Sequence, residues 1–164
     1  MSLYRVLRVV LAPPVRAVWG LEVDGAAHVP PGRVIVVANH DSLSDPFFLA
    51  AALERQLRFL AKRELWRIGL GGWALDRLGG IPVERRRGDV GAVAAAAHAL
   101  EQAAAVAIFG ADAVLRPGTR LPRRARVKVV IGSPIVVERT SPTIPATREL
   151  TERLREAVAA LHAA

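Results

Sequence analysis

The 164-residue chain has no cysteine, few aromatic residues and no long hydrophobic run. Without cysteine it can have no disulfide framework, no catalytic thiolate and no zinc site built from thiolates. Aromatic residues make up only 5% of the chain and no nucleic-acid recognition motif is present, so we expect no nucleic-acid partner. No uncharged apolar run reaches the roughly 18 residues that predict a transmembrane helix.

Positive charge is abundant, with 23 basic against 15 acidic residues and a formal net charge of +8. Only Lys62 and Lys128 are lysines, so the excess is almost entirely arginine, whose planar side chain pairs well with phosphate oxygens. A field of this sign attracts anionic lipid surfaces and phosphorylated substrates. The length and the 52% of hydrophobic residues predict one folded domain over residues 1–164.

The first 20 residues are apolar but interrupted by arginines and by Pro13 and Pro14. They lack a cleavage signal, so we do not expect a secretory leader. Residues 2–12 are predicted to form a short basic amphipathic helix, with Trp19 nearby. Such a helix can lie on a membrane surface or pack on the domain, and the sequence leaves both interpretations open.

Strand and helix patterns alternate along the rest of the chain. The run 33–38 is typical of a strand buried on both faces. Further strands are predicted at 57–61, 81–83, 106–109 and 125–138, and helices at 46–56, 90–105 and 146–163, the last with Leu150, Leu154, Val158 and Leu161 on its buried face. Residues 64–80 are predicted to form two short helices around Gly71-Gly72. This order predicts an α/β fold with a mostly parallel central sheet flanked by helices.

His40 follows the strand 33–38, and Asp45 stands just before the helix predicted to begin at Pro46. In open parallel sheets, functional residues lie beyond the carboxyl ends of the strands. A carboxylate on one imidazole nitrogen raises the basicity of the other, which can then take a proton from an alcohol. Alternatively, Asp45 only caps its helix and His40 only ends its strand. The spacing alone is compatible with both.

The stretch Asn39-His40-Asp41-Ser42-Leu43-Ser44-Asp45 resembles the NHxSxxD (HX4D) block of the PlsC-type glycerolipid acyltransferases, the lysophosphatidate acyltransferases and their relatives. Residues 57–86 resemble the family's second block, in which "AK.EL" leads to "G.IPV.R"; Lys62, Glu64, Gly80, Ile81, Pro82, Val83 and Arg85 match it. Residues 110–135 resemble its last segment. The family's phosphate-binding FPEGTRS block is lacking after Phe109, and "PGTR" (117–120) is interpreted as a turn.

The resemblance implies a shortened glycerol-3-phosphate acyltransferase-like fold and acyl transfer from acyl-CoA or acyl carrier protein to a lysophospholipid hydroxyl. His40 would be the general base and Asp45 its orienting partner. Arg85 would bind the acceptor's phosphate, with Lys62, Asn39 and Ser42 as further substrate-binding residues. No metal or cofactor is implied, and the protein would act at an anionic membrane surface on the cytoplasmic face, as a peripheral or monotopic protein.

Two other functions follow if the missing block weakens acceptor binding. The chain could be an inactive lipid-surface-binding homologue, or an acyl-CoA thioesterase in which water replaces the alcohol. A serine hydrolase is disfavoured because no G-x-S-x-G motif occurs. A histidine metal site is disfavoured because the spacings of His28, His40, His98 and His162 match no ligand pattern.

Overall fold

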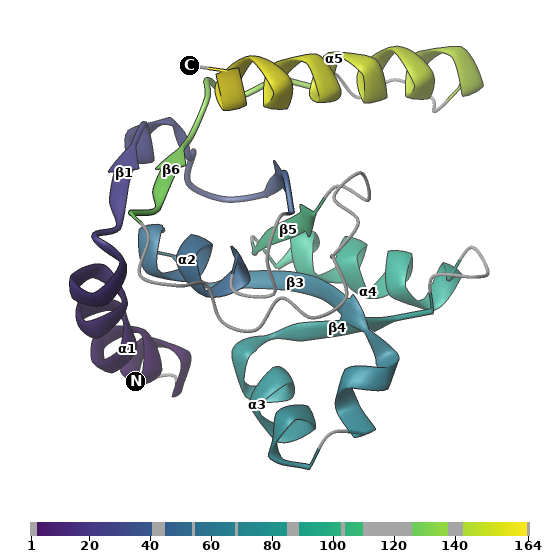
Figure 1. Cartoon of the computed structure of the whole chain (residues 1–164). Helices are drawn as coiled ribbons and strands as arrows, with labels where there is room; N and C mark the ends of the chain where they lie inside the picture. The colour runs from purple at the N-terminus through teal and green to yellow at the C-terminus, as the bar shows by residue number, and fades with distance from the viewer. Residues whose placement is uncertain are drawn as a thin grey trace.

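A computed structural model describes residues 3–40, 45–53, 55–67, 69–84, 89–102, 104–109, 126–137 and 143–163. Its centre is a four-stranded sheet, flanked by helices (Figure 1). The strand order is β2 (Val34–Ala38), β5 (Ala105–Phe109), β3 (Leu57–Lys62) and β4 (Gly80–Val83). All three neighbouring pairs run parallel, so the predicted α/β class is confirmed.

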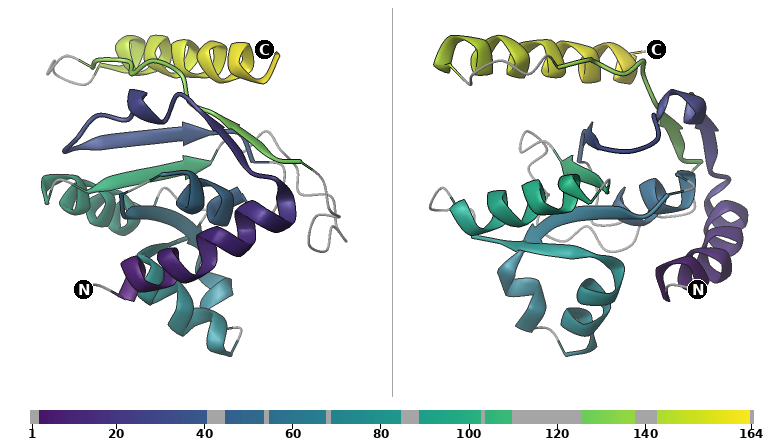
Figure 2. Two further views of the ribbon diagram at one scale, coloured as in Figure 1. Left: turned by 90° about the vertical axis from the view of Figure 1, so that its left-hand side faces the viewer. Right: turned by 180° about the vertical axis from the view of Figure 1, so that it is seen from behind.

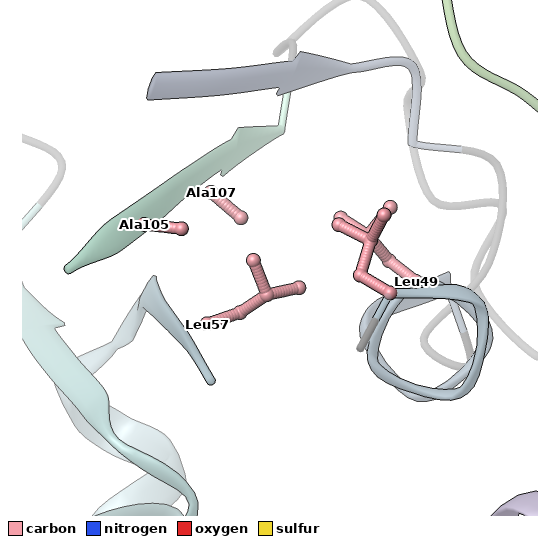
Figure 3. Packing of buried hydrophobic residues seen from close by; sticks show 5 residues of the cluster. Leu49, Leu57, Ala105 and Ala107 are labelled. Carbon is pink, nitrogen blue, oxygen red and sulfur yellow. The ribbon is translucent and has the colours of Figure 1, made fainter. Parts of the chain in front are cut away.

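The core lies between this sheet and helix α2 (Asp45–Ala52). Leu49 and Leu53 pack against Leu57, Ala105 and Ala107, and Figure 3 shows Leu49 reaching from the helix toward the strands. The small alanine side chains on β5 allow the leucines to approach the sheet closely. Since α2 begins at the carboxyl end of β2, this packing also fixes the amino end of the helix at that edge of the sheet.

Helix α4 (Val90–Glu101) contacts strands β3, β4 and β5. Successive side chains of a strand point to opposite faces, so Val106 lies on the face of β5 opposite Ala105 and Ala107. Val106 is fully buried, and Ala92 and Ala99 of α4 are buried as well. The sheet is thus covered on both faces near β5, which explains why 105–109 is continuously apolar.

Helix α1 (Leu3–Trp19) is longer than predicted and continues through Pro13 and Pro14. Each proline removes one backbone donor, but contacts with α2 compensate. Ala12 is buried, the Arg16 guanidinium donates to the Ala51 carbonyl at 3.1 Å, and Trp19 meets Phe48 edge to face. The predicted end at residue 12 was wrong because tertiary packing outweighs the local helix-breaking tendency.

The strand predicted over 125–138 is much shorter. Among the strands that the structure describes, β6 (Lys128–Val130) pairs in parallel only with β1 (Glu22–Asp24), which was not predicted, and the two form a separate sheet. Pro134 has no backbone donor, so it cannot support a longer ladder. The short 3-10 helix η1 (Ala26–His28) follows β1.

The region between β3 and β4 also differs from the prediction. It contains the 3-10 helix η2 (Arg63–Arg67) and helix α3 (Leu70–Leu78), and the break falls at Gly69, with φ of 42°, not at Gly71-Gly72. A Cβ at Gly72 would lie 2.6 Å from the Trp66 carbonyl oxygen. Gly72 therefore permits close packing of η2 on α3 and does not end a helix.

The remaining helices agree with the predictions more closely. Helix α2 ends at Ala52 and α4 at Glu101, each about one turn before the predicted end. Helix α5 (Ile144–Ala163) has its predicted face half-buried, comprising Leu150, Leu154, Val158 and Leu161. It lies at the opposite end of the molecule from α3 (Figure 2). Among the described residues, no helix combines the length and hydropathy needed to cross a bilayer.

Candidate active site

His40 and Asp45 meet at the carboxyl edge of the sheet. His40 lies two residues beyond β2, and Asp45 is the first residue of α2. The imidazole Nδ1 and the Asp45 Oδ2 are 2.9 Å apart. The side chains are 13% and 23% exposed, so the pair is partly withdrawn from water yet accessible. The end of β2 and the start of α2 thus bring together two residues that a continuous helix would hold apart.

This geometry assigns the tautomer of the imidazole. An ionised carboxylate only accepts hydrogen bonds, so Nδ1 carries the proton and donates it to Asp45. The lone pair then lies on Nε2, which makes no hydrogen bond to any residue that the structure describes. An imidazole with an oriented Nδ1–H and an available Nε2 has the arrangement that general-base chemistry requires.

Phe109 forms one side of this site. It ends β5, and the register pairs it with Ala38, the last residue of β2. Its ring centroid lies 4.9 Å from that of His40, with 39° between the ring planes. Phe109 was not among the site residues predicted from the sequence. Its position at a strand end was visible, but its strand was not known to lie beside β2.

Polar residues follow the next two strands. Lys62 ends β3, is exposed, and stands in register with Val83 at the end of β4. Beyond them, Arg63 Nε pairs with Glu84 Oε1 at 3.1 Å. Strand spacing places β3 about 10 Å and β4 about 14 Å from β2.

The structure describes only some of the other predicted site residues. Asn39 is exposed and immediately precedes His40. Ser42 and Arg85 lie outside the described residues, as do Arg86, Arg87 and the PGTR stretch at 117–120. Within the described part of the chain, no three His, Asp or Glu residues lie close enough together to hold a metal ion.

Comparison with known proteins identifies the class to which this fold and site belong. The model of the acyltransferase family matches residues 20–131, a segment that contains His40, Asp45, Lys62 and Phe109. The chain therefore belongs to the acyltransferase family, and this membership supports a transferase activity. The chain matches no curated protein and no solved structure.

Proposed function

We propose that this chain is a PlsC-type enzyme of phospholipid biosynthesis, which transfers an acyl group to the free hydroxyl of a lysophospholipid such as 1-acylglycerol 3-phosphate. Acyl-CoA or acyl carrier protein is the donor. The observation that most directly supports the proposal is the 2.9 Å hydrogen bond between His40 Nδ1 and Asp45 Oδ2. Both residues lie inside the segment that matches the acyltransferase family.

In the proposed reaction, Nε2 of His40 takes the proton of the acceptor's hydroxyl as the oxygen attacks the thioester carbonyl. The carbon–sulfur bond breaks, and the leaving sulfur takes the proton back from the imidazolium. The products are an ester and a free thiol, and no acyl-enzyme forms. Asp45 holds the ring and stabilises the imidazolium. General-base catalysis of the kind proposed for His40 is worth roughly 10²–10⁴-fold in rate.

The acceptor's phosphate is bound by Arg85, with Lys62 adding positive field. A guanidinium can hold two phosphate oxygens at once, which orients the acceptor as well as binding it. Asn39 and Ser42 flank His40 in the sequence and are proposed to contact the substrates. The reaction as written needs no metal or redox cofactor.

The acceptor is a membrane lipid, so we propose that the protein works at an anionic membrane surface on the cytoplasmic side. Val6, Val9 and Val10 share one face of α1 and are 39%, 61% and 61% exposed. Trp73 of α3 is 55% exposed, and the Arg77 guanidinium lies 5.4 Å from its ring centroid. Helices α1 and α3 contact each other, so these apolar side chains come from adjacent elements. This arrangement supports shallow insertion between lipid headgroups.

The deciding experiment measures thiol release from palmitoyl-CoA with and without 1-acylglycerol 3-phosphate, for the wild type and for His40→Ala. Acceptor-dependent release that is lost in His40→Ala supports the transferase. Release that does not depend on the acceptor indicates a thioesterase. Binding to anionic vesicles without any release indicates an inactive lipid-surface protein. Either of the last two results overturns the proposal.

A further inference from the structure

Helix α2 has Asp45 as its first residue, so the orientation of the helix decides where that carboxylate lies. Phe48 and Leu49 follow Asp45 by three and four residues, and all three therefore share one side of the helix. Phe48 is 6% and Leu49 is 7% exposed. The side of α2 that holds the Asp45 carboxylate is thus also the side by which the helix is anchored to the rest of the molecule.

The two buried side chains are held by different parts of the fold. Leu49 packs against Leu57 in the core of the central sheet. Phe48 meets the Trp19 ring of α1 edge to face, with 5.8 Å between the ring centroids and 71° between the ring planes. Consecutive residues of a helix lie about 100° apart around its axis. The contact with the sheet and the contact with α1 together therefore fix the rotation of α2 about its own axis.

Helix α1 also holds the carboxyl end of α2. The Ala51 carbonyl belongs to the last turn of α2, where carbonyl oxygens run out of partners within the helix. The Arg16 guanidinium donates to this carbonyl at 3.1 Å, and the helix dipole favours a positive charge at that end. Figure 2 shows α1 lying against α2. Arg16 and Trp19 are one turn apart on α1, so this helix supports α2 at two points.

A small rotation of α2 is enough to break the bond between His40 and Asp45. Side chains reach roughly 5 Å from the axis of a helix, so a rotation of about 10° moves a carboxylate by about 1 Å. The distance of 2.9 Å between Nδ1 and Oδ2, lengthened by that amount, exceeds the range of a hydrogen bond. The contacts that prevent this rotation therefore determine whether the pair forms.

We propose that Trp19 is a positioning residue for acyl transfer, which holds Phe48 and thereby fixes the direction in which Asp45 presents its carboxylate to His40. The inference rests on the proposed function, in which His40 takes the proton of the acceptor's hydroxyl. Helix α1 then has a role besides contact with lipid, because its last turn supports the active site. Trp19 acts through α2 and does not touch the reacting atoms.

The test measures kcat and KM of the full chain with a short-chain acceptor, 1-hexanoylglycerol 3-phosphate, dissolved as monomers without vesicles. Membrane binding does not enter this assay. For Trp19→Leu, which keeps an apolar side chain but loses the ring, we expect kcat to fall about tenfold with KM within about twofold of wild type, since errors of about 1 Å in placement are costly. An unchanged kcat in Trp19→Leu overturns the inference.

Two variants of α1 are the matched controls. Trp19→Phe keeps an aromatic ring for Phe48 and should restore kcat to within about twofold of wild type. Val18→Ala changes the neighbouring side chain, which is 43% exposed, and should leave both constants unchanged. A loss of kcat in Val18→Ala equal to that in Trp19→Leu contradicts the role given to Trp19.

A double variant separates positioning from a general loss of stability. In an Asp45→Asn background, Trp19→Leu should cause almost no further fall in kcat, because it acts through Asp45. A variant that only destabilises the fold lowers kcat in both backgrounds. If Trp19→Leu does not fold, Phe48→Leu removes the other ring of the same contact and is measured in the same way. An unchanged kcat in Phe48→Leu then overturns the inference.

His40→Ala distinguishes the two levels of the argument. Activity that persists in His40→Ala refutes the proposed function. Activity that is lost in His40→Ala but normal in Trp19→Leu refutes the positioning role alone.

The positioning role can also be followed without turnover. Nitrogen NMR of a chain labelled at histidine reports the tautomer of each neutral imidazole, and His40→Ala assigns the His40 signals. We expect the Nδ1–H tautomer of His40 in the wild type, because Nδ1 donates to Asp45. Trp19→Leu should give a mixture with the Nε2–H tautomer. The same tautomer in both proteins contradicts the inference even if the chain proves to have no acyltransferase activity.

Discussion

The imidazole of His40 packs against the ring of Phe109, with their centroids 4.9 Å apart. The contact is made possible by the parallel register in which Ala38 of β2 stands beside Phe109 of β5. One side of His40 is therefore fixed by an aromatic ring and Nδ1 by a carboxylate. The ring contact with Phe109 and the hydrogen bond to Asp45 together orient the His40 side chain.

Removal of the Phe109 ring should loosen the imidazole. We expect Phe109→Ala to lower kcat about tenfold, because the base would be less well placed for proton transfer. The half-buried ring should also contribute about 2 kcal/mol to the free energy of unfolding. Steady-state kinetics and urea unfolding measure the two effects. Ile108→Ala is the control, since Ile108 points to the opposite face of β5; an equal loss of kcat in that variant would contradict the role given to Phe109.

His40 and Asp45 should act as one unit. We expect Asp45→Asn to lower kcat on the order of 10²-fold, because the amide can no longer stabilise an imidazolium. In a His40→Ala background the same substitution should have almost no further effect, since residues that act together are not additive. Single-turnover kinetics of both single variants and the double variant measure this. Fully additive losses would show that Asp45 acts independently of the imidazole.

The exposed valines of α1 should contribute to membrane binding. We expect Val9→Ser combined with Val10→Ser to weaken binding to anionic vesicles roughly tenfold, from the loss of about 1 kcal/mol or less per side chain. Vesicle sedimentation measures the fraction of the protein that is bound to the vesicles. The matched control is Val136→Ser with Val137→Ser, because these valines are 82% and 62% exposed and belong to the segment between β6 and α5, not to α1. If both pairs weaken binding equally, α1 is not the membrane-facing element.

The stability conferred by Asp89 should depend on pH in a defined direction. The hydrogen bonds from the Glu84 and Ala92 backbone amides, aided by the nearby Arg63 charge, lower the pKa of Asp89 below its ordinary value of 3.8. A lowered pKa in the folded state means that the stabilisation is complete above 3.8 and is lost as the pH falls through the folded-state pKa.

Urea unfolding of wild type and Asp89→Asn across a pH series tests this sign. The difference in unfolding free energy between the two proteins should be constant from neutral pH down to about 5 and should shrink below the ordinary pKa. A difference that grows toward acid would mean that the carboxylate is stabilised in its protonated form, contrary to the hydrogen bonds seen.

Much of the fold could be predicted because its signals are local. The apolar runs that became β2, β3 and β5 were located to within a residue or so. The predicted bounds were wrong where contacts between residues far apart in the sequence determine the length of a helix or strand. Helix α1 passes through Pro13 and Pro14 because Ala12 and Arg16 pack on α2. Strand β6 is short because its only described partner is β1.

The same division applies to the candidate site. The sequence was sufficient to predict that His40 follows a strand and that Asp45 stands at the start of the next helix, because only four residues separate the two in the chain. Tertiary structure alone decided that Phe109 lies against the imidazole and that Arg63 pairs with Glu84. These contacts depend on which strands become neighbours and in what register. The order and register of the strands depend on many residues that are far apart in the chain. A local sequence pattern therefore does not predict them.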